Sequence, residues 1–107
     1  MIQVREYIDD DGRNHFAMWR ATLEPVTRAR VDVSLDRLER GNKSAMKSIG
    51  AGVAELRLNF DPGFRVYCGM DGEALVILLA GGTKQRQHVD VALAKTLWKQ
   101  YKQGKRS

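Results

Sequence analysis

The residues best suited to chemistry lie on two predicted strands in the second half of the chain. Arg57 falls in the run Val53 to Phe60, and Arg65 and Tyr67 fall in the run Phe64 to Cys68. In both runs apolar and polar residues alternate, which is the pattern of strands that bury one face. The two arginines and the tyrosine therefore share one face of a predicted sheet. Because guanidinium groups make charge-assisted hydrogen bonds with anions, this face is the first indication of a site.

The elements that must position these side chains are two hairpins. We expect Phe60 to face Phe64 across the first turn, which places Asn59 beside Arg65 and Arg57 beside Tyr67. Asp61-Pro62-Gly63 suits a loop of several residues, and Asp71-Gly72 is typical of a two-residue type I′ turn. The run from residue 74 to residue 80 is apolar throughout, so we expect it to form a strand buried on both faces.

The rest of the chain predicts helices around this sheet. We expect a first strand over 2–8, a helix over about 13–23 with Asp9 to Asp11 as candidate caps, and a second helix from Pro25 to Arg40. Residues 43–52 are expected to form a loop, and a last helix is expected over about 85–103, with a frayed tail at 104–107. The order β-α-α-β-β-β-α predicts one α+β domain over 1–107, with helices packed on an antiparallel or mixed sheet.

The positive charge is concentrated at the end of the chain. The formal net charge is +5, and the segment from residue 84 onward holds one acid, Asp90, among seven basic residues: Lys84, Arg86, Lys95, Lys99, Lys102, Lys105 and Arg106. Together with Arg57 and Arg65, such a basic surface favours a polyanionic partner, most often a nucleic acid. A solvated helix with a frayed basic tail is the alternative for the last few residues.

Several classes of function have no support in the sequence. The chain has neither an apolar run of membrane-spanning length nor a signal-peptide pattern at its start, so we expect a cytoplasmic protein without membrane contacts. No group of His, Cys, Asp and Glu has metal-ligand spacing, so neither a metal nor another cofactor is expected. Gly50-Ala51-Gly52 predicts a turn rather than a phosphate cradle, and the lone Cys68 predicts a buried apolar side chain.

The motifs of the second half, taken in series, resemble a known family. The chain reads ELR, then PGFRVY, then LLAGGTK, then a helix with AKTLW, and upstream it carries FAMW and RLERGN. This series is similar to the RelE/ParE superfamily of toxin–antitoxin toxins, and most of all to its HigB-like "addiction module killer" branch. The resemblance covers nearly the whole chain and implies a RelE-like fold.

The resemblance implies a toxin that a cognate antitoxin neutralises. For RelE-like members it implies metal-independent cleavage of mRNA, usually on the ribosome, by attack of a ribose 2′-OH on the adjacent phosphate. That reaction needs a proton acceptor, cations for the developing charge, and a proton donor for the leaving oxygen.

Residue by residue, the resemblance assigns the cationic roles to Arg57, Arg65 and Lys84, with Arg86 as a nearby substitute. His88 is the best candidate acid or base, because histidine is the residue type suited to proton transfer near neutral pH. An ordinary polar residue in the first turn of the helix is an equally good interpretation of His88. Tyr67, Lys95 and Lys99 are candidate RNA contacts, although Tyr67 could instead pack on a helix.

Two departures keep other functions open. Glu55 stands where RelE has a second lysine, and Asp90 stands near the position of its late tyrosine. An incomplete catalytic set would favour the ParE-like alternative, an inhibitor of DNA gyrase. A non-catalytic nucleic-acid-binding module is the third possibility, and it would show steep salt dependence without RNA turnover.

Overall fold

The computed structural model describes residues 1–60 and 62–106. Within them the chain forms five strands, three α-helices and one 3₁₀ turn. In chain order these are β1 (Gln3–Glu6), α1 (His15–Ala21), α2 (Pro25–Glu39), β2 (Met46–Gly50), β3 (Val53–Leu58), β4 (Phe64–Met70), β5 (Leu75–Thr83), η1 (Lys84–Arg86) and α3 (Gln87–Arg106). Asp61 of the first predicted turn and Ser107 of the predicted tail lie outside the described residues.

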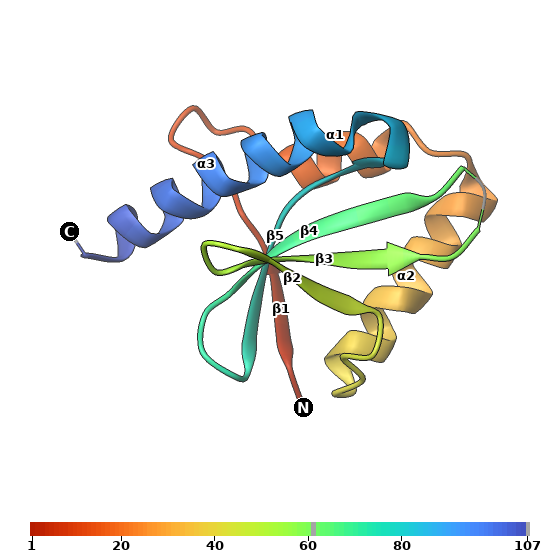
Figure 1. The fold of residues 1–107 in the computed structure, drawn as a ribbon, viewed down its shortest axis with the longest axis horizontal. Coiled ribbons are helices and arrows are strands. Elements are labelled where there is room, and N and C mark those ends of the chain that lie inside the picture. The colour runs from red at the N-terminus through yellow and green to blue at the C-terminus, as the bar shows by residue number, and fades with distance from the viewer. Residues whose placement is uncertain (61, 107) are drawn as a thin grey trace.

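The strands form a single mixed sheet in the order β1-β5-β4-β3-β2 (Figure 1). The edge strand β1 runs parallel to β5, and the other neighbours are antiparallel. The prediction of an α+β fold with helices on a mixed sheet is therefore confirmed.

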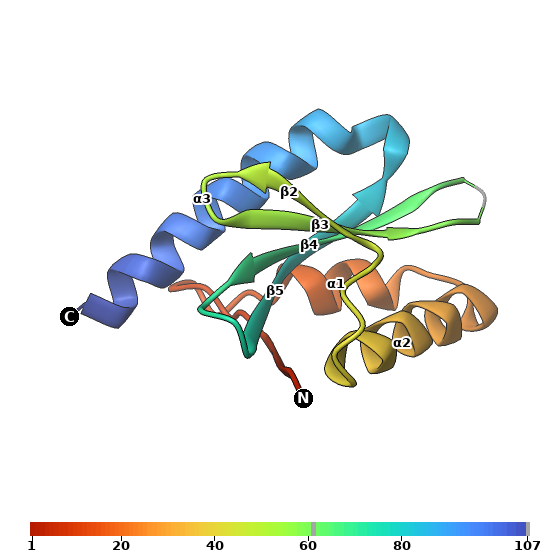
Figure 2. The ribbon, with the colours of Figure 1, turned by 60° about the horizontal axis from the view of Figure 1, so that its bottom comes forward.

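Helices cover both faces of this sheet (Figure 2). Helices α1 and α2 lie on one face, where Phe16 and Leu38 pack with Leu56 and Val66. Helix α3 lies on the other face, where a second core surrounds Trp98. Strand β5 contributes Val76 and Leu78 to the first core and Ile77 and Leu79 to the second. Its uninterrupted apolar run correctly predicted a strand buried on both faces.

The segment predicted as a loop over 43–52 contains a strand, β2, and this prediction was wrong. The strand is a partly exposed edge in which only Met46 and Ile49 are half-buried. Its pairing with β3 shifts register between Ser48 and Gly50. Met46 packs on the core beneath α1 and α2 and Ile49 on the core beneath α3, as alternation requires for two residues three apart in a strand. With only these two apolar residues among exposed ones, the segment lacks the alternating pattern by which a strand is recognised in a sequence.

The predicted register of β3 and β4 was also wrong, by two residues. Leu58 pairs with Phe64, Arg57 pairs with Arg65, and Glu55 pairs with Tyr67. Strand β3 ends at Leu58, so the connecting loop is longer than expected, and it is closed by a hydrogen bond from the Gly63 amide to the Phe60 carbonyl. A slip of two residues leaves each side chain on its predicted face, but it changes every cross-strand neighbour.

The turns and helix ends differ in smaller ways. Residues 71–74 join β4 to β5, and of Asp71 and Gly72 only the glycine has positive φ, so the connection is not a type I′ turn. The predicted turn at Gly50 to Gly52 is confirmed, with positive φ at all three positions. The side chain of Asn14, rather than one of the preceding aspartates, caps α1. Helix α3 starts after the 3₁₀ turn and continues to Arg106, beyond the expected end.

Trp98 seats α3 on the sheet. Its side chain is 4% exposed and stacks on Tyr101 with ring centroids 5.0 Å apart. A Cβ added at Gly52 would lie 2.7 Å from Trp98 Nε1, and one added at Gly69 would overlap the Trp98 ring. Gly52 in the β2–β3 turn and Gly69 on β4 thus let the indole lie directly on the backbone.

Candidate anion-binding site

The two arginines lie opposite each other on adjacent strands, on the face that α3 covers. Arg57 of β3 pairs with Arg65 of β4 in the sheet register. The Arg57 side chain is 42% exposed, whereas that of Arg65 is 11% exposed. The sequence correctly predicted a shared face for these residues, and the structure makes them direct cross-strand neighbours.

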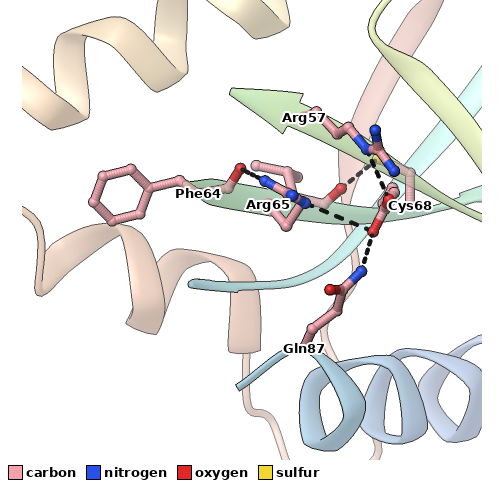
Figure 3. A network of polar contacts seen from close by, with 7 residues as sticks. Arg57, Phe64, Arg65, Cys68 and Gln87 are labelled. Atoms are coloured by element: carbon pink, nitrogen blue, oxygen red, sulfur yellow. Dashed lines mark hydrogen bonds and ion pairs between the residues drawn. The ribbon is translucent and has the colours of Figure 1, made fainter. Parts of the chain in front are cut away.

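A buried carboxylate separates these two like charges. Glu55 is 1% exposed, and its Oε1 accepts a hydrogen bond from Arg57 Nε at 3.0 Å (Figure 3). Its Oε2 accepts a hydrogen bond from Gln87 Nε2 at 3.0 Å and lies 3.8 Å from Arg65 Nε. Arg65 also donates from Nη1 to the Phe64 carbonyl at 3.2 Å. Three elements, β3, β4 and the start of α3, therefore meet at one acid.

Lys84 lies at the same end of the sheet as Arg65. Its backbone amide donates to the Gly63 carbonyl at 2.9 Å. A Cβ placed on Gly63 would lie 3.5 Å from Lys84 Cβ and 3.7 Å from Arg65 Nη1. The β3–β4 loop thus brings Lys84 and Arg65 close together. Lys84 is exposed and so adds an accessible positive charge beside the less accessible guanidinium.

Arg86 and His88 are exposed where α3 begins, one on each side of Gln87. Their positive charge acts on Asp90, whose carboxyl is 8% exposed. Burial raises the pKa of Asp90, and the charges of Arg86 and His88 partly oppose this rise. Among the described residues His88 makes no hydrogen bond or ion pair with Arg57 or Arg65. Its assignment as acid or base stays a prediction.

Tyr67 cannot serve as the predicted RNA contact, because its side chain is fully buried. It packs in the α3 core, and its hydroxyl has no hydrogen-bond partner among the described residues. Burial and the nearby charges of Asp90 and Glu55 raise the pKa of Tyr67 to about 12. The alternative interpretation, packing on a helix, is the one the structure bears out.

Lys95 and Lys99 lie farther along α3, away from the arginine pair. Lys95 is half-buried and reaches the β2–β3 turn, where a Cβ on Gly50 would lie 3.8 Å from Lys95 Nζ. Lys99 is exposed one helical turn later. Both can contact a long polyanion, but the structure does not bring them into the cluster around Glu55.

A groove of about 470 Å³ adjoins the arginine pair on the side of α2. Arg57 is one of its lining residues, together with Arg30 and Arg37 of α2 and the apolar side chains of Leu56 and Phe60. Arg30 lies over the Phe60 ring, 4.8 Å from its centroid. The groove is thus basic at its rim and apolar at its base.

Sequence reasoning found the arginines but missed the acid that organises them. In the resemblance to RelE, Glu55 counts only as a departure, and no sequence motif includes Gln87. The sequence does carry a signal for Glu55. It lies two residues before Arg57 on the same strand, so the two side chains point to the same face. Nothing in the sequence indicated Gln87, since its contact depends on where α3 begins.

The candidate site in the described part of the chain is a cluster of cations around one acid. No three of its His, Cys, Asp and Glu side chains are grouped so that they could hold a metal ion. None of its helices is both long and apolar enough to cross a membrane. Arg57, Arg65 and Lys84 can stabilise negative charge on a phosphate, which is the chemistry of a site that binds or cleaves nucleic acid.

The comparisons with known proteins agree with this fold. Residues 18–102 match the family model described as "Phage derived protein Gp49-like (DUF891)". An uncharacterised protein of Haemophilus influenzae is 37% identical over 83 residues, which is 77% of this chain and 84% of that protein. The chain belongs to the Gp49-like family.

Among solved structures, an arginine double mutant of the E. coli toxin RelE in its free state has the same fold. The TM-score is 0.60 with 14% sequence identity, over 88% of this chain and 95% of that one. The predicted RelE-like fold is thereby confirmed, and at this identity the similarity extends to the fold alone.

Proposed function

We propose that this protein is the toxin of a toxin–antitoxin module, of the HigB-like type, and that it is a metal-independent endoribonuclease acting on mRNA in the cytoplasm, in association with the ribosome. The observation that carries the proposal is the direct opposition of Arg57 and Arg65, with Lys84 at the same end of the sheet. The RelE-like fold and the Gp49-like family support it.

In this mechanism the ribose 2′-OH attacks the adjacent phosphate. The bond to the 5′ oxygen of the next nucleotide breaks, which leaves a cyclic phosphate and a 5′-OH. Arg57 and Lys84 are exposed enough to contact the phosphate, and Arg65 adds positive charge from the floor of the site. His88 accepts the proton of the attacking 2′-OH and donates a proton to the leaving 5′ oxygen. Arg86, Lys95 and Lys99 hold neighbouring phosphates.

A cognate antitoxin is the expected protein partner. The exposed cations at the start and along the outer side of α3 favour an acidic or amphipathic segment as the part of the antitoxin that covers the site. Copurification of the two proteins, with loss of toxicity in the complex, would support this expectation.

Inhibition of DNA gyrase is the second candidate, and Glu55 favours it. A buried carboxylate beside the arginines lowers the net charge available to stabilise a phosphorane, and Tyr67 is withdrawn into the core. A protein inhibitor would need neither a strongly cationic site nor an exposed tyrosine.

The test is controlled expression of wild type, Arg57→Ala and Arg65→Ala, with growth followed alongside primer extension on a cellular mRNA. Arg13→Ala, which removes an exposed arginine from the loop before α1, is the matched control. We expect growth arrest with new 5′ ends for wild type and control, and loss of both for the site variants, with circular dichroism showing that each variant is folded.

Each other outcome selects a different function. Arrest without new 5′ ends would refute the ribonuclease and favour gyrase inhibition. If expression of the folded wild-type protein causes no growth arrest, the proposal that it is a toxin is refuted. Salt-sensitive RNA binding without cleavage would then identify a nucleic-acid-binding module.

A further inference from the structure

Glu55 lies buried between Arg57 and Arg65, and stability of the fold does not explain why a carboxylate is buried there. Glu55 is 1% exposed, although it carries a carboxylate in the middle of β3. The residues before and after it in the strand, Ala54 and Leu56, are apolar. Removing a carboxylate from water is costly, and a well-packed apolar residue commonly stabilises a fold at least as well as a buried ion pair. The contacts of Glu55 indicate what it provides instead.

Both carboxylate oxygens of Glu55 are engaged. Oε1 accepts from Arg57 Nε at 3.0 Å, and Oε2 accepts from Gln87 Nε2 at 3.0 Å while facing Arg65 Nε at 3.8 Å. An acid held in this way, and almost without solvent contact, is poorly placed to take a proton from a substrate. The geometry of Glu55 therefore does not favour a direct catalytic role.

The contact with Arg57 leaves the outer part of that side chain available. Because Arg57 donates through Nε, its two terminal amines remain for another anion. Without a counter-charge, Arg57 and Arg65 would be like charges directly opposite each other, an arrangement that destabilises a strand pair. Glu55 both fixes the orientation of one guanidinium and allows the two to lie side by side.

We propose that Glu55 is the positioning residue of the anion site: it holds Arg57 and Arg65 together for a phosphate and ties them, through Gln87, to the first turn of α3. This inference rests on the proposed function for its catalytic part. Its binding and orientation parts can be tested whether or not the protein cleaves RNA.

The proposal predicts that affinity and turnover change in opposite directions in Glu55→Gln. The amide keeps the size of the side chain but removes its negative charge, so the cluster becomes more positive and binds phosphate more tightly, by roughly threefold to tenfold. The amide has one acceptor oxygen in place of two and so cannot accept from both Arg57 and Gln87. The guanidinium groups therefore lose their orientation, and turnover falls, by about 100-fold for a displacement near 1 Å. A residue that only supports the fold would not raise affinity.

Two further variants separate charge from position. Glu73→Gln makes the same charge change at an exposed position in the β4–β5 connection, at the other end of the sheet, and should alter neither quantity. Gln87→Ala removes the neutral donor to Oε2 without changing the charge. It should lower turnover by roughly tenfold with no gain in affinity.

Binding is measured with a short single-stranded RNA whose riboses are 2′-O-methylated, which cannot be cleaved by 2′-OH attack. Turnover is measured with the unmodified RNA over a range of pH. Orientation is measured by side-chain NMR of the arginine Nε–H groups. Arg57 Nε–H, hydrogen-bonded to Glu55, should give a slowly exchanging signal that disappears in Glu55→Gln.

The outcomes have distinct meanings. Tighter binding, slower turnover and loss of the Arg57 signal, with an unchanged shape of the pH–rate profile, are the expected results. Loss of one limb of that profile would make Glu55 a proton acceptor and overturn the positioning role, as would unchanged binding or an unchanged Arg57 signal in folded Glu55→Gln. Absence of cleavage by wild type, with the binding and NMR changes intact, would refute only the ribonuclease.

Discussion

Replacing Gly69 with alanine should unseat helix α3. The added Cβ would overlap the Trp98 ring, which packs directly against the backbone at this position. The ring cannot move aside easily, because it stacks on Tyr101 at 5.0 Å and its Nε1 edge faces Gly52. We therefore expect the helix to lift from the sheet and expose part of the Trp98 side chain.

The magnitude follows from two contributions. Overpacking of a core costs about 1–3 kcal/mol. Re-exposing about 50 Å² of an indole that is now almost entirely buried costs about 1 kcal/mol more. The free energy of unfolding should thus fall by about 3 kcal/mol, a large part of the stability of a domain of this size. In a domain of about 100 residues this lowers Tm by roughly 12–24 °C.

The assay is thermal and urea unfolding followed by circular dichroism, with Gly104→Ala as the matched control. A Cβ at Gly104 meets no atom within 4 Å, so the same substitution in α3 should be neutral or stabilise by up to about 1 kcal/mol. In a Trp98→Leu background the cost of Gly69→Ala should shrink to below about 1 kcal/mol, because the overlapping ring is absent. An equal cost in both backgrounds would refute the reasoning.

Two further predictions concern buried ionisable groups. Burial raises the pKa of Asp90, so its ionisation destabilises the fold as pH rises from its unfolded pKa through its folded one. Asp90→Asn should therefore gain stability relative to wild type in urea unfolding as pH rises above the unfolded pKa of an aspartate, about 3.9, and a difference independent of pH would contradict this. Burial also raises the pKa of Cys68 to about 12, so the thiol should react with a thiol reagent only after unfolding. Reaction in the native state at the rate of the unfolded chain would show that Cys68 is accessible.

The sequence predicted most of the fold because the strongest patterns were local. The apolar run of β5, the stripe of Val31, Leu35 and Leu38 on α2, and the Gly41-Asn42 stop all appear where they were expected. At that stop the amides of Gly41 and Asn42 donate to the carbonyls of Leu38 and Arg37, the usual closure of a helix C-terminus. Strand β2 was not predicted, because its two apolar side chains, Met46 and Ile49, lie three residues apart and form no period-2 pattern.

The site was predicted in part, and the error has a physical origin. Alternation along a strand fixes which face a side chain occupies, and this placed Arg57, Arg65 and Tyr67 correctly on one face. Alternation does not say how much of that face a helix covers, so the burial of Tyr67 was not foreseen. The register also depended on the length of the β3–β4 loop, which turn residues alone did not determine.

The parallel pairing of β1 with β5 has a consequence for how the protein is made. Val4 pairs with Val76, so within the described sheet the first strand has no neighbour until β5 has been synthesised. Gln87, which completes the contacts of Glu55, comes later still. Contacts this distant in sequence form slowly during folding. A nascent chain therefore cannot complete the contacts around Glu55 until Gln87 has been synthesised and α3 has begun to fold.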